Sequence, residues 1–427
     1  MSSISARGRT LRTGAPPATG TTPKSILARL DRISVWSLPF MFIGIIGTGF
    51  LFAFYDVFDI NVSFIQSCVA LKHGCTPVNA VTALRIPVVL NLAGYVIGAL
   101  VLAPISDRIG RRNMLLFTML LTGLGSLYNA LAPDYTQFVL ARVITGIGVG
   151  ADLAIVNTYV GEVAPRRNRA RWISVIFIMS SLGALLGIWL GLFLTTSPAP
   201  WPHGLSFAQA GPGFTDGWRW MYAVGALLAA IGVLLRLELP ESARWLVGRG
   251  RLNEADKVVS DMEVLAAKHG PLPPVPDDVP VDQTTPESSR AFRALFSHRT
   301  YTRRVIQLLA VWFLAYVTVF GFSAGFTSML VSLKYPAPEA GLITAIGAFG
   351  FLACALFAVA FADRIERKLW LPIGAVITVA GGVIVAEAGT TSLAIAFIGA
   401  AIVFFGFNIW VPMTYTLSTE SFPLVPA

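Results

Sequence analysis

Long apolar runs, separated by short polar stretches, recur along the whole chain. A transmembrane helix needs about 20 predominantly apolar residues, and runs of this kind occur at ten places. We therefore predict an all-α polytopic membrane protein with ten spanning helices. The runs centre near residues 36–60, 84–105, 114–132, 137–160, 172–195, 218–238, 304–330, 341–361, 369–388 and 392–416.

An internal repeat divides these runs into two sets. The charged loop Asp107–Arg112 returns as Asp363–Lys368, and Glu162–Pro165, which closes the fourth run, returns as Glu420–Pro423 after the tenth. The shifts are 363 − 107 = 256 and 420 − 162 = 258 residues. The chain is therefore predicted to hold two copies of one membrane module, six runs in the first and four in the second. Repeated halves are the usual construction of secondary transporters.

The second copy is predicted to be two helices shorter than the first. In the first copy two runs follow Pro165 and lead to Pro240, whereas four residues follow Pro423. A second copy of equal length would extend 240 − 165 = 75 residues further, to 423 + 75 = 498. A frameshift, an early stop or a shortened form would each give this pattern. We expect the 427-residue chain to be less thermostable than an extended form and to transport poorly or not at all.

Composition and charge placement exclude a soluble protein and a nucleic-acid binder. Of 427 residues, 55% are hydrophobic and 13% charged, and the mean hydropathy is +0.69, which is too apolar for a soluble globular chain. The net charge is +9, but the basic residues gather in the N-terminal arm and in every second loop. This asymmetry predicts a cytoplasmic N-terminus and cytoplasmic basic loops in a plasma or inner membrane. No nucleic-acid partner is expected.

Four regions follow from this pattern. Residues 1–34 form a predicted disordered cytoplasmic tail, because they are rich in Ser, Thr, Gly, Pro and Arg and lack periodicity. Residues 35–238 form an N-terminal six-helix bundle. Residues 239–303 form a cytoplasmic linker, in which residues 253–268 have the spacing of an amphipathic surface helix. Residues 304–427 form an incomplete C-terminal bundle of four helices.

Four motifs together resemble the major facilitator superfamily. Asp107–Arg112 resembles the signature that follows helix 2, although Ala103 stands where a glycine is usual. Arg142–Gly150 resembles the Arg and glycine motif of helix 4, and Glu162–Pro165 with Arg169 resembles the end of that helix. Pro240–Leu246 closely matches the segment after helix 6. The resemblance is to the sugar-porter-like and the phosphate or organic-anion:proton symporter branches. It implies two helical bundles, alternating access and a transport function rather than an enzyme.

Charged residues at the mouths of the helices are predicted to form a cytoplasmic gate. Acidic residues among basic ones can form an ion-pair latch that holds one conformation and releases in the other. The alternative is that the arginines only follow the positive-inside bias. The candidate gate residues are Asp107, Arg108, Arg111, Arg112, Glu162, Arg169, Glu241, Arg244, Asp363, Arg364 and Glu420.

Four ionisable residues lie within the predicted spans and are candidates for proton coupling. Asp56 and Asp59 are three residues apart and share one helix face. Arg142 lies at comparable depth, and Asp152 lies near the middle of its helix. Intramembrane charges are costly and usually functional, and a carboxyl group between burial and an arginine can titrate. By resemblance, Asp56 matches a helix 1 Asp of proton-coupled sugar porters and Asp152 a helix 4 Asp of phosphate symporters. A static Arg142–Asp56 salt bridge is the alternative.

Aromatic and polar residues on two helices of the second copy are candidates for binding substrate. An aromatic and hydroxyl mixture suits a small organic metabolite, and an organic acid is preferred because Arg142 could oppose an anion. The helix 7 Asp of phosphate symporters and the paired Gln of sugar porters are absent, which argues against phosphate and hexose. The candidate residues are Trp312, Tyr316, Asn408, Trp410 and Tyr415.

The sequence favours a proton-coupled symporter, with small solute, proton and lipid as partners of a monomer. A membrane solute sensor and a truncated, nonfunctional paralogue are the alternatives. The four histidines are scattered in loops, so neither a metal nor another cofactor is expected. Cys68 and Cys75 share one external loop, where they are equally compatible with a disulfide and with two free thiols. Cys354 is expected to pack within a helix bundle.

Overall fold

The structure, a computed structural model, describes residues 22–33, 37–38, 40–164, 169–268, 270–275, 296, 299–361, 364–388 and 392–421. Within these residues the chain is almost entirely helical, and ten helices are long and apolar enough to cross a membrane. The predicted all-α fold with ten spans is confirmed. The first and seventh spans are longer than their predicted apolar runs, because the helices continue to Leu71 and begin at Arg299.

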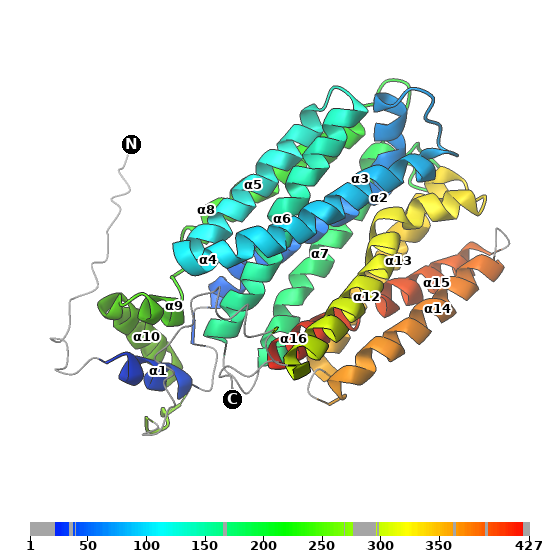
Figure 1. The fold of residues 1–427 in the computed structure, drawn as a ribbon. Coiled ribbons are helices and arrows are strands. Elements are labelled where there is room, and N and C mark those ends of the chain that lie inside the picture. Colours follow the sequence, from blue (N-terminus) through cyan, green and yellow to red (C-terminus); the bar gives the residue numbers. More distant parts are fainter. Residues whose placement is uncertain are drawn as a thin grey trace, which may run out of the picture.

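The first half is a bundle of six spans (Figure 1). α2 packs against α7 and α8, both α3 and α5 pack on α6, and α5 also packs on α8. The second span is one continuous rod in which a π-helical turn, η1, joins α3 to α4. The elements are α2 (Phe40–Leu71), α3 (Ala80–Ile97), η1 (Gly98–Leu102), α4 (Ala103–Ile109), α5 (Arg111–Leu131), α6 (Tyr135–Val163), α7 (Arg169–Thr195) and α8 (Gly217–Arg236).

Glycines on α6 allow α3 to approach its backbone. A Cβ at Gly146 would lie 2.1 Å from the Asn91 carbonyl oxygen, and one at Gly150 would lie 2.1 Å from the Tyr95 carbonyl oxygen. No side chain fits in either place, so these glycines serve helix packing. The close approach also positions Tyr95, which contacts the second half.

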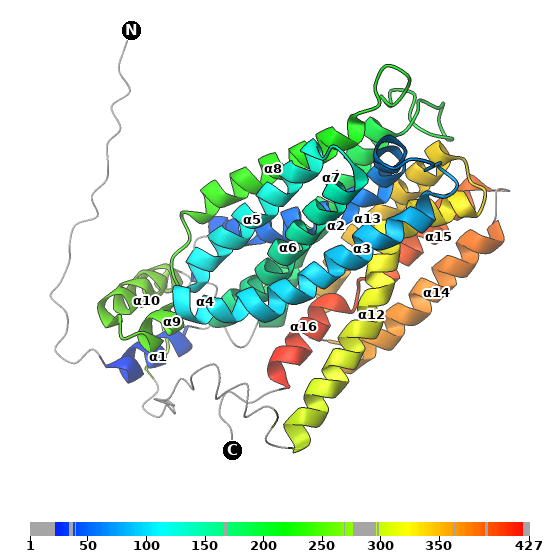
Figure 2. The same ribbon diagram turned by 45° about the horizontal axis from the view of Figure 1, so that its top comes forward.

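The second half contains four spans (Figure 2). α13 and α14 pack on α15, and the tenth span is interrupted at residues 407–410, between α15 and α16. The sequence predicted one unbroken run there. Pro412 lies in the first turn of α16, where a proline favours starting a helix and prevents its continuation from before. The elements are α12 (Arg299–Ser332), α13 (Ala337–Phe361), η3 (Arg367–Leu369), α14 (Trp370–Ala388), α15 (Leu393–Gly406) and α16 (Val411–Glu420).

The halves meet mainly through α13 against α7 and α12 against α2. The bundle has two ends. We call the end that carries residues 107–112 the basic end, and the end that carries residues 68–79 the disulfide end.

α2 and α12 occupy equivalent places in the two copies, yet 61% of the apolar window of α2 is buried and only 11% of that of α12. α12 and α14 instead border an apolar groove of about 510 Å³ lined by Leu314, Gly374 and Thr378.

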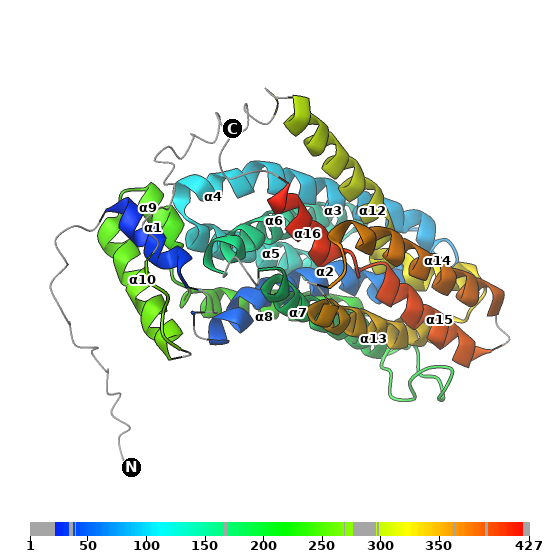
Figure 3. The same cartoon turned by 90° about the horizontal axis from the view of Figure 1, so that it is seen from below.

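Three short helices gather at the basic end (Figure 3): α1 (Pro23–Asp31), α9 (Ala243–Gly248) and α10 (Leu252–Ala267). α10 confirms the predicted amphipathic helix. α1 differs from the predicted tail, because Thr22 and Ser25 form a capping box and Ile26 and Leu30 are buried. Residues 1–21 lie outside the described residues.

Ion pairs fasten α1 to α10. Arg29 lies 2.5 Å from Asp256 and 2.6 Å from Glu263, and Arg32 lies 2.6 Å from Glu263. Burial raises the pKa of Glu263, but hydrogen bonds and charges from Arg29 and Arg32 outweigh it and lower the pKa below its usual value. Residues 22–33 are therefore ordered by ion pairs with a distant part of the chain. Their own sequence has no apolar periodicity that would reveal these contacts.

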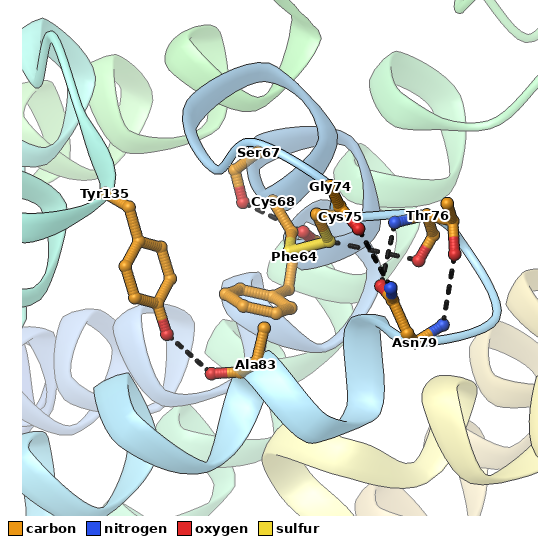
Figure 4. The surroundings of a disulfide bond; sticks show 9 residues. All are labelled: Phe64, Ser67, Cys68, Gly74, Cys75, Thr76, Asn79, Ala83 and Tyr135. Atoms are coloured by element: carbon orange, nitrogen blue, oxygen red, sulfur yellow. Dashed lines mark hydrogen bonds between the residues drawn. A yellow bond between two sulfur atoms is a disulfide. The ribbon is translucent and has the colours of Figure 1, made fainter.

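A disulfide joins Cys68, at the end of α2, to Cys75 in the following turn, with a Cα–Cα distance of 5.9 Å (Figure 4). The Asn79 side chain donates to the Gly74 carbonyl at 2.9 Å and accepts from the Thr76 N–H at 2.8 Å. The sequence was equally compatible with a disulfide and with two free thiols, and the structure contains the disulfide. Cys354 is buried, as expected.

Candidate functional site

Asp56, Asp59 and Arg142 form a buried charged cluster between α2 and α6. Arg142 Nη1 lies 3.2 Å from Asp56 Oδ1 and 3.5 Å from Asp59 Oδ1, and Nη2 donates to the Asp56 backbone carbonyl at 2.9 Å. All three residues are at most 1% exposed. The structure therefore brings together three of the four predicted coupling residues.

The cluster has more acceptors than donors. One guanidinium faces two carboxyl groups, and both oxygens of Asp59 and Oδ2 of Asp56 lack a hydrogen-bond partner. An unpaired buried charge is strongly unfavourable. With both groups ionised the cluster carries one excess negative charge, which one bound proton would neutralise.

Asp152 belongs to a second buried pair and not to this cluster. Its carboxylate contacts both terminal nitrogens of Arg236 and accepts from the Thr118 hydroxyl at 2.8 Å. Asp152 is 152 − 142 = 10 residues beyond Arg142, about 15 Å along the helix axis. Any Cβ at Gly49 would collide with the Arg236 guanidinium. The pair therefore locks α2, α5, α6 and α8 together.

Arg236 was not among the residues predicted from the sequence. It lies at the end of the sixth apolar run, where an arginine is expected to reach the membrane surface, but its side chain is fully buried. The available signal was Asp152 itself, since an intramembrane carboxylate usually has a cationic partner.

Asn61 is a second residue that sequence reasoning missed, and it links the two halves. Its side-chain nitrogen donates to the Ser323 carbonyl at 2.6 Å and to the Phe322 carbonyl at 3.0 Å, and its oxygen accepts from the Thr327 N–H at 3.0 Å. Ser323 and Thr327 are four residues apart, the spacing of a helical hydrogen bond. An amide of α2 is therefore inserted into the hydrogen-bond ladder of α12.

The four predicted aromatic substrate residues, which come from α12, from the break at residues 407–410 and from α16, form one cluster. The Trp312 ring centroid lies 5.2 Å from that of Tyr316, 5.7 Å from Trp410 and 4.6 Å from Tyr415. The Tyr316 and Tyr415 hydroxyls are 3.0 Å apart. Tyr95 of α3 lies 6.1 Å from Tyr316, so the first half also contributes to the cluster.

Asn408, the fifth predicted substrate residue, lies in the break between α15 and α16. It is fully buried, and neither its side-chain oxygen nor its nitrogen has a hydrogen-bond partner. Buried amides are normally paired. This side chain therefore has unused capacity to donate to and accept from a bound solute.

At the basic end the predicted gate is centred on Arg111. Its guanidinium lies 2.5 Å from Asp107 and 3.0 Å from Glu162. Glu241 accepts from the backbone N–H groups of Arg111 at 2.9 Å and Arg112 at 3.3 Å. A carboxylate at the N-terminus of α5 is also favoured by the helix dipole. The expected network thus exists around four of the predicted residues.

The other predicted gate residues are placed less centrally. Arg112 donates to the Leu237 carbonyl at 2.5 Å, and Arg244 pairs with Asp31 of α1. Arg108 is exposed. Arg364 lies 5.3 Å above the Phe361 ring. Asp363 and the side chains of Arg169 and Glu420 lie outside the described residues, so their predicted roles remain predictions.

The described residues contain no group of His, Cys, Asp and Glu that could hold a metal ion.

Known proteins similar to this chain are transporters. The family described as "Sugar (and other) transporter" matches residues 39–426. A D-xylose transporter of Levilactobacillus brevis is 30% identical, covering 78% of this chain and 70% of that protein. A niacin transporter of Acinetobacter baylyi is 25% identical, covering 81% and 72%. The xylose transporter of Escherichia coli in a partially occluded inward-open conformation matches with a TM-score of 0.68 at 23% identity, covering 90% and 85%. This structural likeness shows the fold.

Proposed function

Because the chain belongs to the sugar (and other) transporter family of the major facilitator superfamily, we propose that it is a secondary transporter that couples a small organic metabolite to protons. The observation that carries the proposal is the buried cluster of Asp56, Asp59 and Arg142, with two carboxyl groups around one guanidinium. Such a site exchanges a proton whenever its surroundings change between dry and hydrated. A site that faces each side of the membrane in turn couples this exchange to movement of the solute.

Two sets of contacts, one at each end of the bundle, account for alternating access. Asn61 holds α2 to α12 toward the disulfide end, and Arg111 with Glu162 and Glu241 holds the basic end of the first half. We propose that these contacts break and form in alternation, since a latch acts only if it stabilises one of two conformations.

The charge balance bears on the substrate. Arg142 is already engaged by two carboxyl groups, so an organic anion can pair with it only after protons neutralise Asp56 and Asp59. This order makes an organic acid a natural proton-coupled cargo. Similar proteins carry D-xylose and niacin, one a neutral sugar and the other an aromatic acid. The aromatic cluster and the unpaired amide of Asn408 suit a small planar solute with hydrogen-bonding groups.

We further propose that the basic end faces the cytoplasm, in a plasma or inner membrane. Basic residues accumulate on the cytoplasmic side, and disulfides persist in oxidising compartments. The Cys68–Cys75 bridge lies at the opposite end from Arg111 and Arg112. Both observations give the same orientation, with a cytoplasmic N-terminus.

Accumulation in proteoliposomes tests the function. An extended form of the chain, with a second half as long as the first, is reconstituted and supplied with labelled D-xylose, nicotinate or 4-hydroxybenzoate under an imposed pH gradient. A symporter concentrates at least one solute above equilibrium, and a protonophore abolishes this. A sensor binds a solute, as detected by a thermal shift, without concentrating it. Binding without accumulation would therefore contradict the proposal.

A further inference from the structure

The loop between α7 and α8, residues 196–216, is built onto the first half. The Gln209 N–H donates to the Phe193 carbonyl at 2.8 Å, and the Ala210 N–H donates to the Thr196 carbonyl at 3.1 Å. The ring of Phe207 packs 6.1 Å from that of Phe193. The base of the loop is therefore fixed to the end of α7.

The tip of the same loop contacts the second half. His203 Nδ1 lies 2.5 Å from Oε1 of Glu339, in the first turn of α13. Trp201 stacks on Phe397 of α15 with ring centroids 6.4 Å apart. The loop thus crosses the boundary between the halves at the disulfide end.

A pocket of about 470 Å³ lies between the halves, beside the base of this loop. Its wall includes loop residues, and its lining reaches the α2–α12 contact, because Thr327 both lines the pocket and donates its N–H to Asn61. Residues from the helices and the loop line the pocket together: Val62, Gln66, Thr196, Gly211, Thr215 and Thr327.

We propose that residues 196–216 form a strap that holds the disulfide end shut. The inference rests on the proposed function, which places this end outside and requires it to open. The strap acts through the His203–Glu339 contact and the Trp201–Phe397 stack.

Thiol labelling of the full chain in proteoliposomes tests the strap. A cysteine replaces Val62, which lines the pocket and is 2% exposed, in a Cys354→Ala background. Its labelling by an impermeant maleimide is normalised to that of glutathione. His203→Ala and Trp201→Ala each remove one contact between the loop and the second half. We expect the double variant to label about threefold or more faster than the parent.

Asp216→Asn is the matched control, because Asp216 pairs with Arg219 of the first half and not with the second. It should label at the rate of the parent. Labelling of the His203→Ala, Trp201→Ala double variant at the parent's rate would overturn the strap. The readout needs no substrate, so a chain that transports nothing still tests it.

A crosslink gives a second measurement. A Cβ at Gly204 would lie 3.1 Å from Cβ of Pro338, close to the spacing of about 3.5–4.5 Å in disulfides. Gly204→Cys with Pro338→Cys should crosslink on mild oxidation and stop Val62→Cys labelling. Failure to crosslink in folded protein would contradict the contact.

Discussion

The two halves of this molecule repeat one architecture but bury different chemistry. The first half buries Asp56, Asp59, Asp152, Arg142 and Arg236, whereas the buried polar residues in the described part of the second half are uncharged. Those residues are Ser323, Thr327, Ser328, Thr344, Thr378, Asn408 and Thr414.

The internal repeat allows the two halves to be compared position by position. A shift of 257 residues, within the 256–258 observed for the loops, takes Arg142 to Gly399 and Asp152 to Ile409. Gly399 packs against α14, where a Cβ would lie 2.7 Å from the Val385 side chain. The same helical frame therefore holds charge in one copy and close helix packing in the other. We infer that proton handling belongs to the first half and that the second half contributes uncharged contacts to the solute.

The largest effect is expected from Arg142→Met. Removing the guanidinium leaves two buried carboxyl groups without a cation, which costs about 3–5 kcal/mol. Tryptophan fluorescence during thermal unfolding in detergent should show a large fall in Tm. Adding Asp56→Asn and Asp59→Asn should restore most of the loss. An unchanged Tm in Arg142→Met would break the contrast between the halves.

Asn61→Ala tests the contact that joins the halves. The variant leaves the Thr327 N–H and the Ser323 carbonyl without the amide, and each hydrogen bond contributes about 0.5–1.5 kcal/mol net. The disulfide end should therefore open more often, with labelling of Val62→Cys from outside raised by about tenfold. Ser63→Ala is the control, since Ser63 donates within its own helix. Equal labelling in Asn61→Ala and parent would remove Asn61 from the gate.

Asn408→Leu probes the second half. The Asn408 amide is buried without a partner, so an apolar residue of similar size should raise stability by about 1–2 kcal/mol. Solute binding, measured as a ligand-induced thermal shift, should weaken. A loss of stability as large as that of Arg142→Met would show that this half also depends on a buried polar contact.

The smallest effect is expected at the α1–α10 contact. The lowered pKa of Glu263 means that its contribution is fully present above the usual carboxyl pKa and is lost as pH falls through the lowered value. The hydrogen-exchange protection factors of α1, which correct for the intrinsic exchange rate at each pH, should therefore be high near neutral pH and fall below about pH 4.5. Glu263→Gln should show low protection throughout. Protection factors in the parent that do not change with pH would contradict this.

The sequence alone was sufficient to predict the spans, the internal repeat and the three charged residues at the centre of the first half. Apolar length and the cost of a charge in lipid are local properties, so they can be read without knowing the packing. Asp152 was identified as buried for the same reason.

The partners of these residues could not be predicted without knowing how the helices pack. Arg236 lies where the apolar run ends, and its burial depends on the space left by Gly49. Asn61 resembles any polar residue in a helix until α12 is placed beside it. The ordering of α1 depends on acidic residues more than 200 positions away. Contacts across such distances leave no periodic signal in one sequence.

The most direct test of the central claim compares Asp56→Asn with Asp152→Asn in an extended form of the chain, with a second half as long as the first, reconstituted in proteoliposomes. Both changes remove one buried carboxylate from the first half, but only Asp56 belongs to the Arg142 cluster. The quantity measured is accumulation of a transported solute under an imposed pH gradient, with counterflow exchange as the control for folded protein. The account predicts that Asp56→Asn exchanges solute without accumulating it, whereas Asp152→Asn accumulates it despite a lower Tm. Accumulation by Asp56→Asn equal to that of the parent would contradict the account.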